Sequence, residues 1–200
     1  MIHSLIVPGV GGSDHNHWQS WLQRQLMSCS RVQQQDWNLP ILSRWVENFV
    51  ETLDAAPEAV QVIAHSFGCL TSVAALAQHP ELAKKVKKLI LVAPANPARF
   101  APHGFAENSE QHYASYFQQL RIQVPTQMLI SENDPWLSYE DAQALAQHWN
   151  VPVRNLGRVG HINVDSGFQR FPEIFNDLLT DRPQQLHDVA ADRLFFKLAM

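Results

Sequence analysis

The chain has 200 residues, of which 46% are hydrophobic and 17% are charged, and its formal net charge is −4. This composition is typical of a globular protein and excludes an intrinsically disordered chain, which is poor in apolar residues and rich in charge. The negative charge disfavours a nucleic-acid-binding protein, because binding to phosphates needs a basic face. No apolar run approaches the roughly 20 residues that cross a bilayer, so we expect no membrane association.

The N-terminal sequence and the number of cysteines indicate the cellular compartment of the protein. The N-terminus, MIHSLIVPG, lacks the basic start, the long apolar stretch and the cleavage site of a secretory signal. The two cysteines, Cys29 and Cys69, are too few for a disulfide framework. We therefore expect a cytoplasmic protein with a single domain over residues 1–183. Residues 184–200 are predicted to form a helical extension that packs on this domain or on a partner.

Hydrophobic spacing predicts that strands and helices alternate along the chain. In chain order, the pattern predicts a strand over 4–7, a helix around 18–26, a polar edge strand over 31–36, a helix over 42–53, a strand over 59–64, a helix over 67–78 and a strand over 86–93. It then predicts a helix around 110–120 within the loop 94–124, a strand over 126–131, a helix over 138–149, a strand over 153–156 and a helix over 171–179. This alternation favours an α/β fold, with a mostly parallel sheet covered by helices on both faces.

The sequence Ala64-His65-Ser66-Phe67-Gly68 lies between the most apolar predicted strand and the helix that follows it. A turn that exposes a nucleophile at such a junction needs small residues two positions before and after it, because larger side chains would collide there. Ala64 and Gly68 satisfy this requirement, so Ser66 is expected at the apex, beside a helix N-terminus. A helix-capping serine followed by a packing glycine is the alternative interpretation.

A serine needs a base to become a nucleophile, and the base needs an acid to orient it. Asp134 and His161 each follow a predicted strand, so both are expected at the carboxyl edge of the sheet, where open α/β sheets place their sites. The order serine, acid, histidine matches that of one large class of α/β enzymes. Glu132 remains an alternative to Asp134. Surface, packing or loop roles are expected for the other candidates, which are His148, His187 and Asp165.

The glycine-rich loop over residues 9–12 follows the first predicted strand and can offer backbone N–H groups to an oxyanion. We expect the N–H groups of Val10 and Phe67 to serve together in this way. A phosphate-binding loop is the alternative, but the glycines lack the dinucleotide spacing and no Gly-Lys-Ser/Thr sequence follows. His15 and His17 lack a third ligand at a convincing spacing. We therefore expect neither a cofactor nor a metal.

These motifs resemble those of the small single-domain serine hydrolases of the α/β-hydrolase superfamily, the group that includes retinoblastoma-binding protein 9. The resemblance covers most of the chain and rests on Gly12-Ser13, His17-Trp18, Ala-His-Ser-Phe-Gly at 64–68, Asn133-Asp134-Pro135, Gly160-His161-Ile162-Asn163 and Ser166-Gly167. It implies that Ser66 is the nucleophile, Asp134 the acid and His161 the base. Two residues depart from the pattern of the group: Ala64 replaces its usual glycine, and Phe171 stands where a tryptophan is expected.

The residues together predict a serine hydrolase that cleaves an ester, thioester or amide of a small acyl group through an acyl-enzyme. Its partner would be a small-molecule substrate, and we expect a monomer or a weak homodimer. The segment 94–125 must hold a helix as well as any lid, so we expect no large lid and an open site. The expected walls of this site are Phe67, Phe100, Phe105 and Trp136. A hydrolase-fold protein that binds a partner without turnover is the alternative function.

Overall fold

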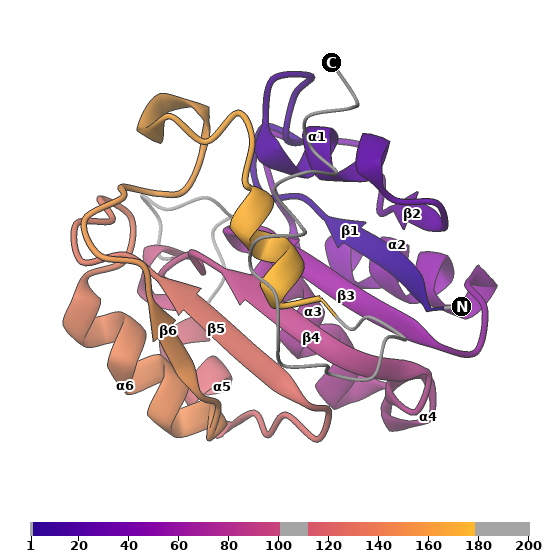
Figure 1. The fold of residues 1–200 in the computed structure, drawn as a ribbon. Helices are drawn as coiled ribbons and strands as arrows, with labels where there is room; N and C mark the ends of the chain where they lie inside the picture. Colours follow the sequence, from indigo (N-terminus) through magenta and orange to yellow (C-terminus); the bar gives the residue numbers. More distant parts are fainter. Residues whose placement is uncertain (1, 101–111, 179–200) are drawn as a thin grey trace, which may run out of the picture.

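A computed structural model describes residues 2–100 and 112–178 of the chain. Its centre is a six-stranded sheet in the order β2-β1-β3-β4-β5-β6, in which every neighbouring pair is parallel. The strands are β1 (His3–Val7), β2 (Cys29–Arg31), β3 (Val60–His65), β4 (Val86–Val92), β5 (Thr126–Ile130) and β6 (Val153–Asn155). Helices lie on both faces of the sheet (Figure 1). The predicted α/β fold with a parallel sheet is therefore confirmed.

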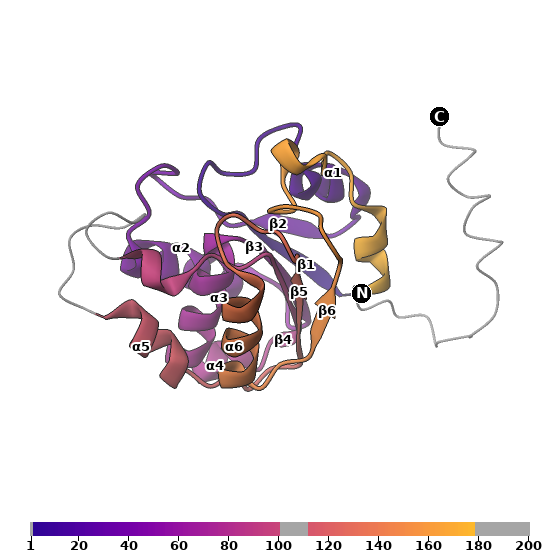
Figure 2. The same ribbon diagram turned by 90° about the vertical axis from the view of Figure 1, so that its left-hand side faces the viewer.

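The helices are divided unequally between the two faces. The described helices are α1 (Trp18–Gln25), α2 (Leu42–Ala55), α3 (Phe67–Gln78), α4 (Pro80–Ala83), α5 (Tyr113–Gln119) and α6 (Tyr139–Trp149), with 3-10 helices η1 (Pro97–Phe100), η2 (Val164–Ser166) and η3 (Pro172–Asn176). Figure 2 shows α2, α3 and α6 against one face, and α1 with η3 against the other. One face is thus covered by long helices and the other by short segments.

The central strand β3 explains why both faces must be covered. All six of its residues are buried, and the strand consists mainly of apolar and β-branched side chains, as expected for the middle of a parallel sheet. Val62 and Ala64 join the core cluster beneath the long helices, whereas Ile63 joins a second cluster with Trp18 and Ile174. Full burial of a side chain such as Ile63 contributes about 2 kcal/mol to stability. The chain that follows β3 therefore starts from a rigid base.

The edge strand is displaced from its predicted position. The sequence pattern predicted a strand over 31–36, but the strand that pairs with β1 is Cys29–Arg31. The Asp36 carboxylate accepts hydrogen bonds from the N–H groups of Asn38 and Leu39, each at 3.0 Å. This local turn removes the end of the predicted strand from the sheet edge, because side-chain bonding of this kind competes with strand pairing.

The predicted helix over 171–179 is also wrong in its described part. The structure has a 3-10 helix over Pro172–Asn176, and residue 179 lies outside the described residues. The N–H of Asp177 bonds to the carbonyl of Ile174, three residues earlier, which is the tighter 3-10 pattern. The carboxylate of Asp177 pairs with Arg154 of β6. That pairing ties the end of the 3-10 helix to the edge strand of the sheet.

The remaining differences are small. The helix predicted around 110–120 is Tyr113–Gln119 in its described part, and the short helix α4 was not predicted. The predicted extension over 184–200 lies outside the described residues. Within the described residues, no helix combines the length and the apolar character needed to cross a bilayer.

Candidate functional site

Ser66 lies at the sharp turn between β3 and α3. Its backbone has φ 55° and ψ −123°, a conformation that costs a non-glycine residue about 1–3 kcal/mol. Backbone hydrogen bonds hold it there: its N–H donates to the carbonyl of Val92, and its carbonyl accepts from the N–H groups of Cys69 and Ala95. The Ser66 side chain makes no capping hydrogen bond to α3. The capping interpretation of this serine is therefore wrong.

The turn is so tight that its glycines are required. A Cβ atom on Gly68 would lie 2.4 Å from the carbonyl oxygen of Val7 and 2.6 Å from that of Pro8. A Cβ atom on Gly9 would lie 2.7 Å from the Cβ of Ser66. The loop after β1 thus runs directly against the Ser66 side chain.

The expected oxyanion donors belong to these two touching segments. Val10 follows Gly9 in the loop after β1, and Phe67 follows Ser66 as the first residue of α3. The N-terminus of α3 adds the positive end of the helix dipole at this point. The arrangement can therefore bring two backbone N–H groups to a substrate oxygen that lies beside the Ser66 hydroxyl.

Three side chains that are far apart in the sequence form one line of hydrogen bonds. The Nε2 atom of His161 lies 2.9 Å from the Oγ of Ser66. Its Nδ1 atom lies 2.8 Å and 3.0 Å from the two carboxylate oxygens of Asp134. Both side chains are nearly buried, with 8% of His161 and 4% of Asp134 exposed. A proton on Nδ1, donated to the carboxylate, leaves Nε2 free to accept the serine proton.

Among the described residues, the other candidates for the acid and the base make no hydrogen bond to His161 or Ser66. Glu132 is exposed, and its Oε1 accepts a hydrogen bond from the Asn155 side chain at 2.9 Å. His148 is exposed in the last turn of α6, and Asp165 is exposed in the first turn of η2. His187 lies outside the described residues. The geometry therefore favours Asp134 over Glu132.

The loop that carries the acid is tied to the loop that carries the histidine. The side-chain oxygen of Asn133 accepts from the N–H of Gly160 at 2.9 Å, and the hydroxyl of Ser131 accepts from the N–H of Val159 at 3.0 Å. Ser131 also donates to the Asn133 oxygen. These bonds fix the separation of the two loops, and sequence reasoning gave Asn133 no role beyond its place in a family motif.

The N–H of His161 is held from the opposite side. It donates to the hydroxyl of Ser166 at 3.0 Å, and this hydroxyl donates to the Asn163 side chain at 2.8 Å. Gly160 has φ 64°, and a Cβ atom there would lie 2.4 Å from the Ser166 oxygen. Ile162 has φ 50°, which is rare for a β-branched residue. The loop thus has an unusual backbone that needs support from its neighbours.

Two further imidazoles lie behind His161. The ring of His65 lies 4.9 Å from those of both His17 and His161, between centroids, and only 4% of His65 is exposed. Burial, with a smaller effect from the charge of Arg31, lowers the pKa of His17 to about 4. Burial also lowers the pKa of His65 well below its ordinary value. Both rings are therefore neutral at neutral pH.

The structure bears on the phosphate and metal interpretations of the first loop. The N–H groups of Gly11 and Gly12 bond to backbone carbonyls, so they do not form a cradle for phosphate. His15 is exposed, whereas His17 is buried and its Nδ1 accepts from the N–H of Gln19 at 3.1 Å. In the described ranges, no three histidine, cysteine or acidic residues are grouped so that they could hold a metal ion.

The residues expected to line the pocket differ in their exposure and position. Trp136 is 38% exposed, its ring lies 6.3 Å from that of His161, and the Arg99 guanidinium lies 4.3 Å above it. Phe67 is only 1% exposed and packs edge-on against Trp45 in the core. Phe105 and the side chain of Phe100 lie outside the described part of the chain. Trp136 is thus the expected pocket residue whose exposed ring is seen beside His161.

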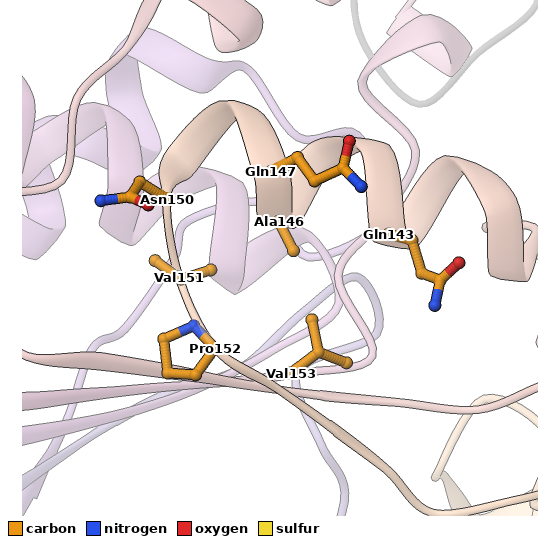
Figure 3. Close-up of a pocket in the computed structure, with 7 residues that line it drawn as sticks. All are labelled: Gln143, Ala146, Gln147, Asn150, Val151, Pro152 and Val153. Carbon is orange, nitrogen blue, oxygen red and sulfur yellow. The ribbon is translucent and has the colours of Figure 1, made fainter.

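A cavity of about 470 Å³ lies away from this site, between α6 and β6. Figure 3 shows its lining, which is Gln143, Ala146, Gln147, Asn150, Val151, Pro152 and Val153. These side chains are amides and apolar groups, and none of them can transfer a proton or act as a nucleophile at neutral pH. Of these two places, the one at Ser66 is therefore the candidate for catalysis.

Comparisons with known proteins identify the family and the fold of this chain. A family model described as serine hydrolase matches residues 4–180. YdeN of Bacillus subtilis strain 168 is 26% identical over 183 residues, which are 88% of this chain and 93% of that protein. A YdeN-like protein from Pectobacterium atrosepticum has a solved structure with a TM-score of 0.78 and 32% identity, over 89% of both chains. The solved structure of YdeN itself gives a TM-score of 0.71 over 88% of this chain and 96% of that one. These structures share an α/β-hydrolase fold with the present chain.

Proposed function

The chain belongs to the serine hydrolase family, and from this premise we propose that it hydrolyses an ester, thioester or amide of a small acyl group. In this proposal Ser66 is the nucleophile, His161 the general base and Asp134 the orienting acid. One observation carries the proposal, which is the continuous line of hydrogen bonds from the Asp134 carboxylate through the His161 ring to the Ser66 hydroxyl.

The first half of the reaction forms an acyl-enzyme. The Oγ of Ser66 attacks the substrate carbonyl carbon while Nε2 of His161 removes the hydroxyl proton, and the carbonyl π electrons move to the oxygen. When the tetrahedral intermediate collapses, the bond to the leaving group breaks and His161 gives its proton to that group. The Asp134 carboxylate holds the ring in the required tautomer and stabilises the imidazolium. Water then repeats the sequence on the acyl-enzyme and releases the acid.

Two charges of opposite sign develop in this reaction, and each has a partner in the protein. The N–H groups of Val10 and Phe67 are proposed to bind the negative oxygen of the intermediate, and loss of one such donor typically lowers kcat by about 10²–10³-fold. The positive charge forms on the His161 ring, beside Asp134. Because burial keeps His17 and His65 neutral, neither ring opposes that charge at neutral pH.

The ring of Trp136 supports the proposed preference for a small acyl group. The partly exposed ring of Trp136 beside His161 offers an apolar wall for a short acyl or leaving group.

Covalent labelling combined with ester turnover tests the proposal. A fluorophosphonate probe should modify Ser66 in the folded protein, and hydrolysis of p-nitrophenyl acetate should fall by about 10⁵-fold in Ser66→Ala. Ser72→Ala is the matched control, because Ser72 is a buried serine of α3, the helix that follows Ser66, and its hydroxyl bonds to the carbonyl of Gly68. This control should keep its activity and its labelling.

Two results would overturn the proposal. Equal turnover in Ser66→Ala and the wild type would remove Ser66 from the mechanism. A folded wild-type protein that is neither labelled nor active on a panel of esters, thioesters and aminoacyl amides would instead be a hydrolase-fold binding protein.

A further inference from the structure

Two consecutive carbonyl groups of the His161 loop accept hydrogen bonds from buried side chains of other elements. Nε2 of His65, the last residue of β3, lies 3.0 Å from the carbonyl oxygen of His161. Nε1 of Trp18, the first residue of α1, donates to the carbonyl oxygen of Ile162 at 2.8 Å. His65 is 4% exposed and Trp18 is fully buried, so water does not replace either bond.

The two bonds act on the backbone that sets the direction of the His161 side chain. The carbonyls belong to the peptide planes that follow His161 and Ile162, and the loop has positive φ at Gly160 and Ile162 on either side of the histidine. A backbone of this kind persists only where surrounding structure enforces it. Fixing both planes restrains the backbone rotation at Ile162. It therefore also restrains the position of the His161 backbone, from which the imidazole extends toward Ser66.

From this geometry we infer that His65 and Trp18 are positioning residues, which hold the His161 ring in line between Asp134 and Ser66. This inference rests on the proposed function and explains why the His161 ring keeps its alignment with Asp134 and Ser66. The carbonyl oxygen can only accept, so the Nε2 atom of His65 must carry the proton.

The donors are themselves fixed by aromatic neighbours. The Trp18 ring lies edge-on to His65 and to Phe171, with centroids 5.9 Å and 5.5 Å apart. The His17 ring lies against His65, and its Nδ1 caps α1 by accepting from the N–H of Gln19. The His17-Trp18 motif, which has no part in proton transfer, thus has a physical role as the support of the histidine loop.

Core packing alone is the competing explanation, and the chain offers controls for it. Trp149 is 1% exposed, and its indole N–H donates to the carbonyl of Phe117 at 2.9 Å, away from the site. Gln61 is buried on β3, and its amide donates to the hydroxyl of Ser4 at 2.9 Å. Trp149→Phe and Gln61→Met therefore remove equally buried side-chain donors without touching the loop.

The test compares kcat and KM for p-nitrophenyl acetate in matched pairs of variants. His65→Leu should lower kcat about 100-fold and Trp18→Phe about tenfold, with KM within about twofold, because a small misplacement of a catalytic group acts on the chemical step. His65→Gln, whose amide N–H can replace the Nε2 donor, should recover kcat to within about fivefold of the wild type. Trp149→Phe and Gln61→Met should stay within about twofold in kcat.

Backbone amide hydrogen exchange gives a readout that does not need activity. Exchange of the amides over 160–163 should accelerate about tenfold in His65→Leu and Trp18→Phe but not in the controls, because the loop loses its inward bonds. If Ser66→Ala is as active as the wild type, the proposed function fails while the exchange result still decides whether the loop is held in this way. If Ser66→Ala is inactive but His65→Leu and Trp18→Phe match their controls in kcat and exchange, the positioning inference is wrong.

Discussion

The turn at Ser66 and the loop at His161 meet at one hydrogen bond, but different forces hold them. At the turn, backbone atoms approach so closely that a Cβ on Gly68 would lie 2.4 Å from a carbonyl oxygen. The loop is held instead by hydrogen bonds to the side chains of other segments, which are Ser131, Asn133, Ser166, His65 and Trp18. Ser66 is thus held by backbone hydrogen bonds in a turn that has no room for a side chain at Gly68, and His161 is held by a distributed set of side-chain contacts.

This difference determines which substitutions should disrupt the turn and which should disrupt the loop. A steric requirement is met by one or two glycines, so a single substitution can destroy it. A typical net hydrogen bond contributes about 1 kcal/mol, so the loss of one loop contact should shift the histidine without unfolding the chain. The turn should therefore fail abruptly, whereas the loop should lose its function by degrees.

Removing the acid should give the largest effect on the loop side. Asp134→Asn should lower kcat by about 10³-fold, because the amide no longer favours the required tautomer and does not stabilise the imidazolium. The matched control is Glu132→Gln, since Glu132 bonds to Asn155 rather than to His161. Its kcat should stay within about twofold in assays with p-nitrophenyl acetate. A larger loss in the Glu132 variant than in the Asp134 variant would transfer the role of the acid to Glu132.

A methyl group at the turn should give the next largest effect. Gly68→Ala should lower the free energy of unfolding by about 3 kcal/mol, because the added atom meets backbone oxygens that cannot move aside. In Gly157→Ala the new Cβ meets no atom within 4 Å, and only the positive φ of 78° is strained. This control should lose about 1 kcal/mol in urea denaturation. Similar losses in the two variants would show that the close approach at Gly68 costs no more than the positive φ at Gly157, and the steric account of the turn would be wrong.

The same contrast explains what the sequence could predict. The turn at Ser66 can be predicted from the sequence because its requirement is local: a small residue two positions before and two after Ser66. The placement of Asp134 and His161 follows from the strand order, because parallel strands bring their carboxyl ends to one edge. Their meeting in space needed no knowledge of the loops themselves.

The features that escaped prediction depend on contacts between distant segments. The sequence places His65 directly before Ser66 and assigns it no contact, yet its ring bonds to a carbonyl 96 residues away in the sequence. The edge strand was displaced because the Asp36 side chain forms a turn that hydrophobic periodicity does not reveal. The 3-10 helix at Pro172–Asn176 ends at an ion pair with Arg154, a residue of another element. The His17-Trp18 motif was one sequence signal for the support behind His161.

The pH dependence of stability should separate the loop from the turn, because His17 belongs to the support of the loop and not to the turn. Its pKa in the folded protein is about 4, below its ordinary value of 6.5. As the pH falls below 6.5, the unfolded chain therefore takes up a proton that the folded protein does not, and stability is lost between pH 6.5 and 4. At about pH 5 this one group should lower the free energy of unfolding by about 2 kcal/mol relative to about pH 7.5.

His17→Asn isolates this contribution, because the Asn side-chain oxygen can still accept from the N–H of Gln19 and cap α1. Urea denaturation at about pH 7.5 and about pH 5 should show that the loss of stability on acidification is about 2 kcal/mol smaller in this variant than in the wild type. Gln61→Met, which changes a buried polar group that does not titrate, should leave the difference between the two pH values as it is in the wild type. An unchanged pH dependence in His17→Asn would mean that His17 takes up its proton in the folded protein. The ring would then carry a positive charge against His65, and the neutral support behind His161 would be lost at the same pH.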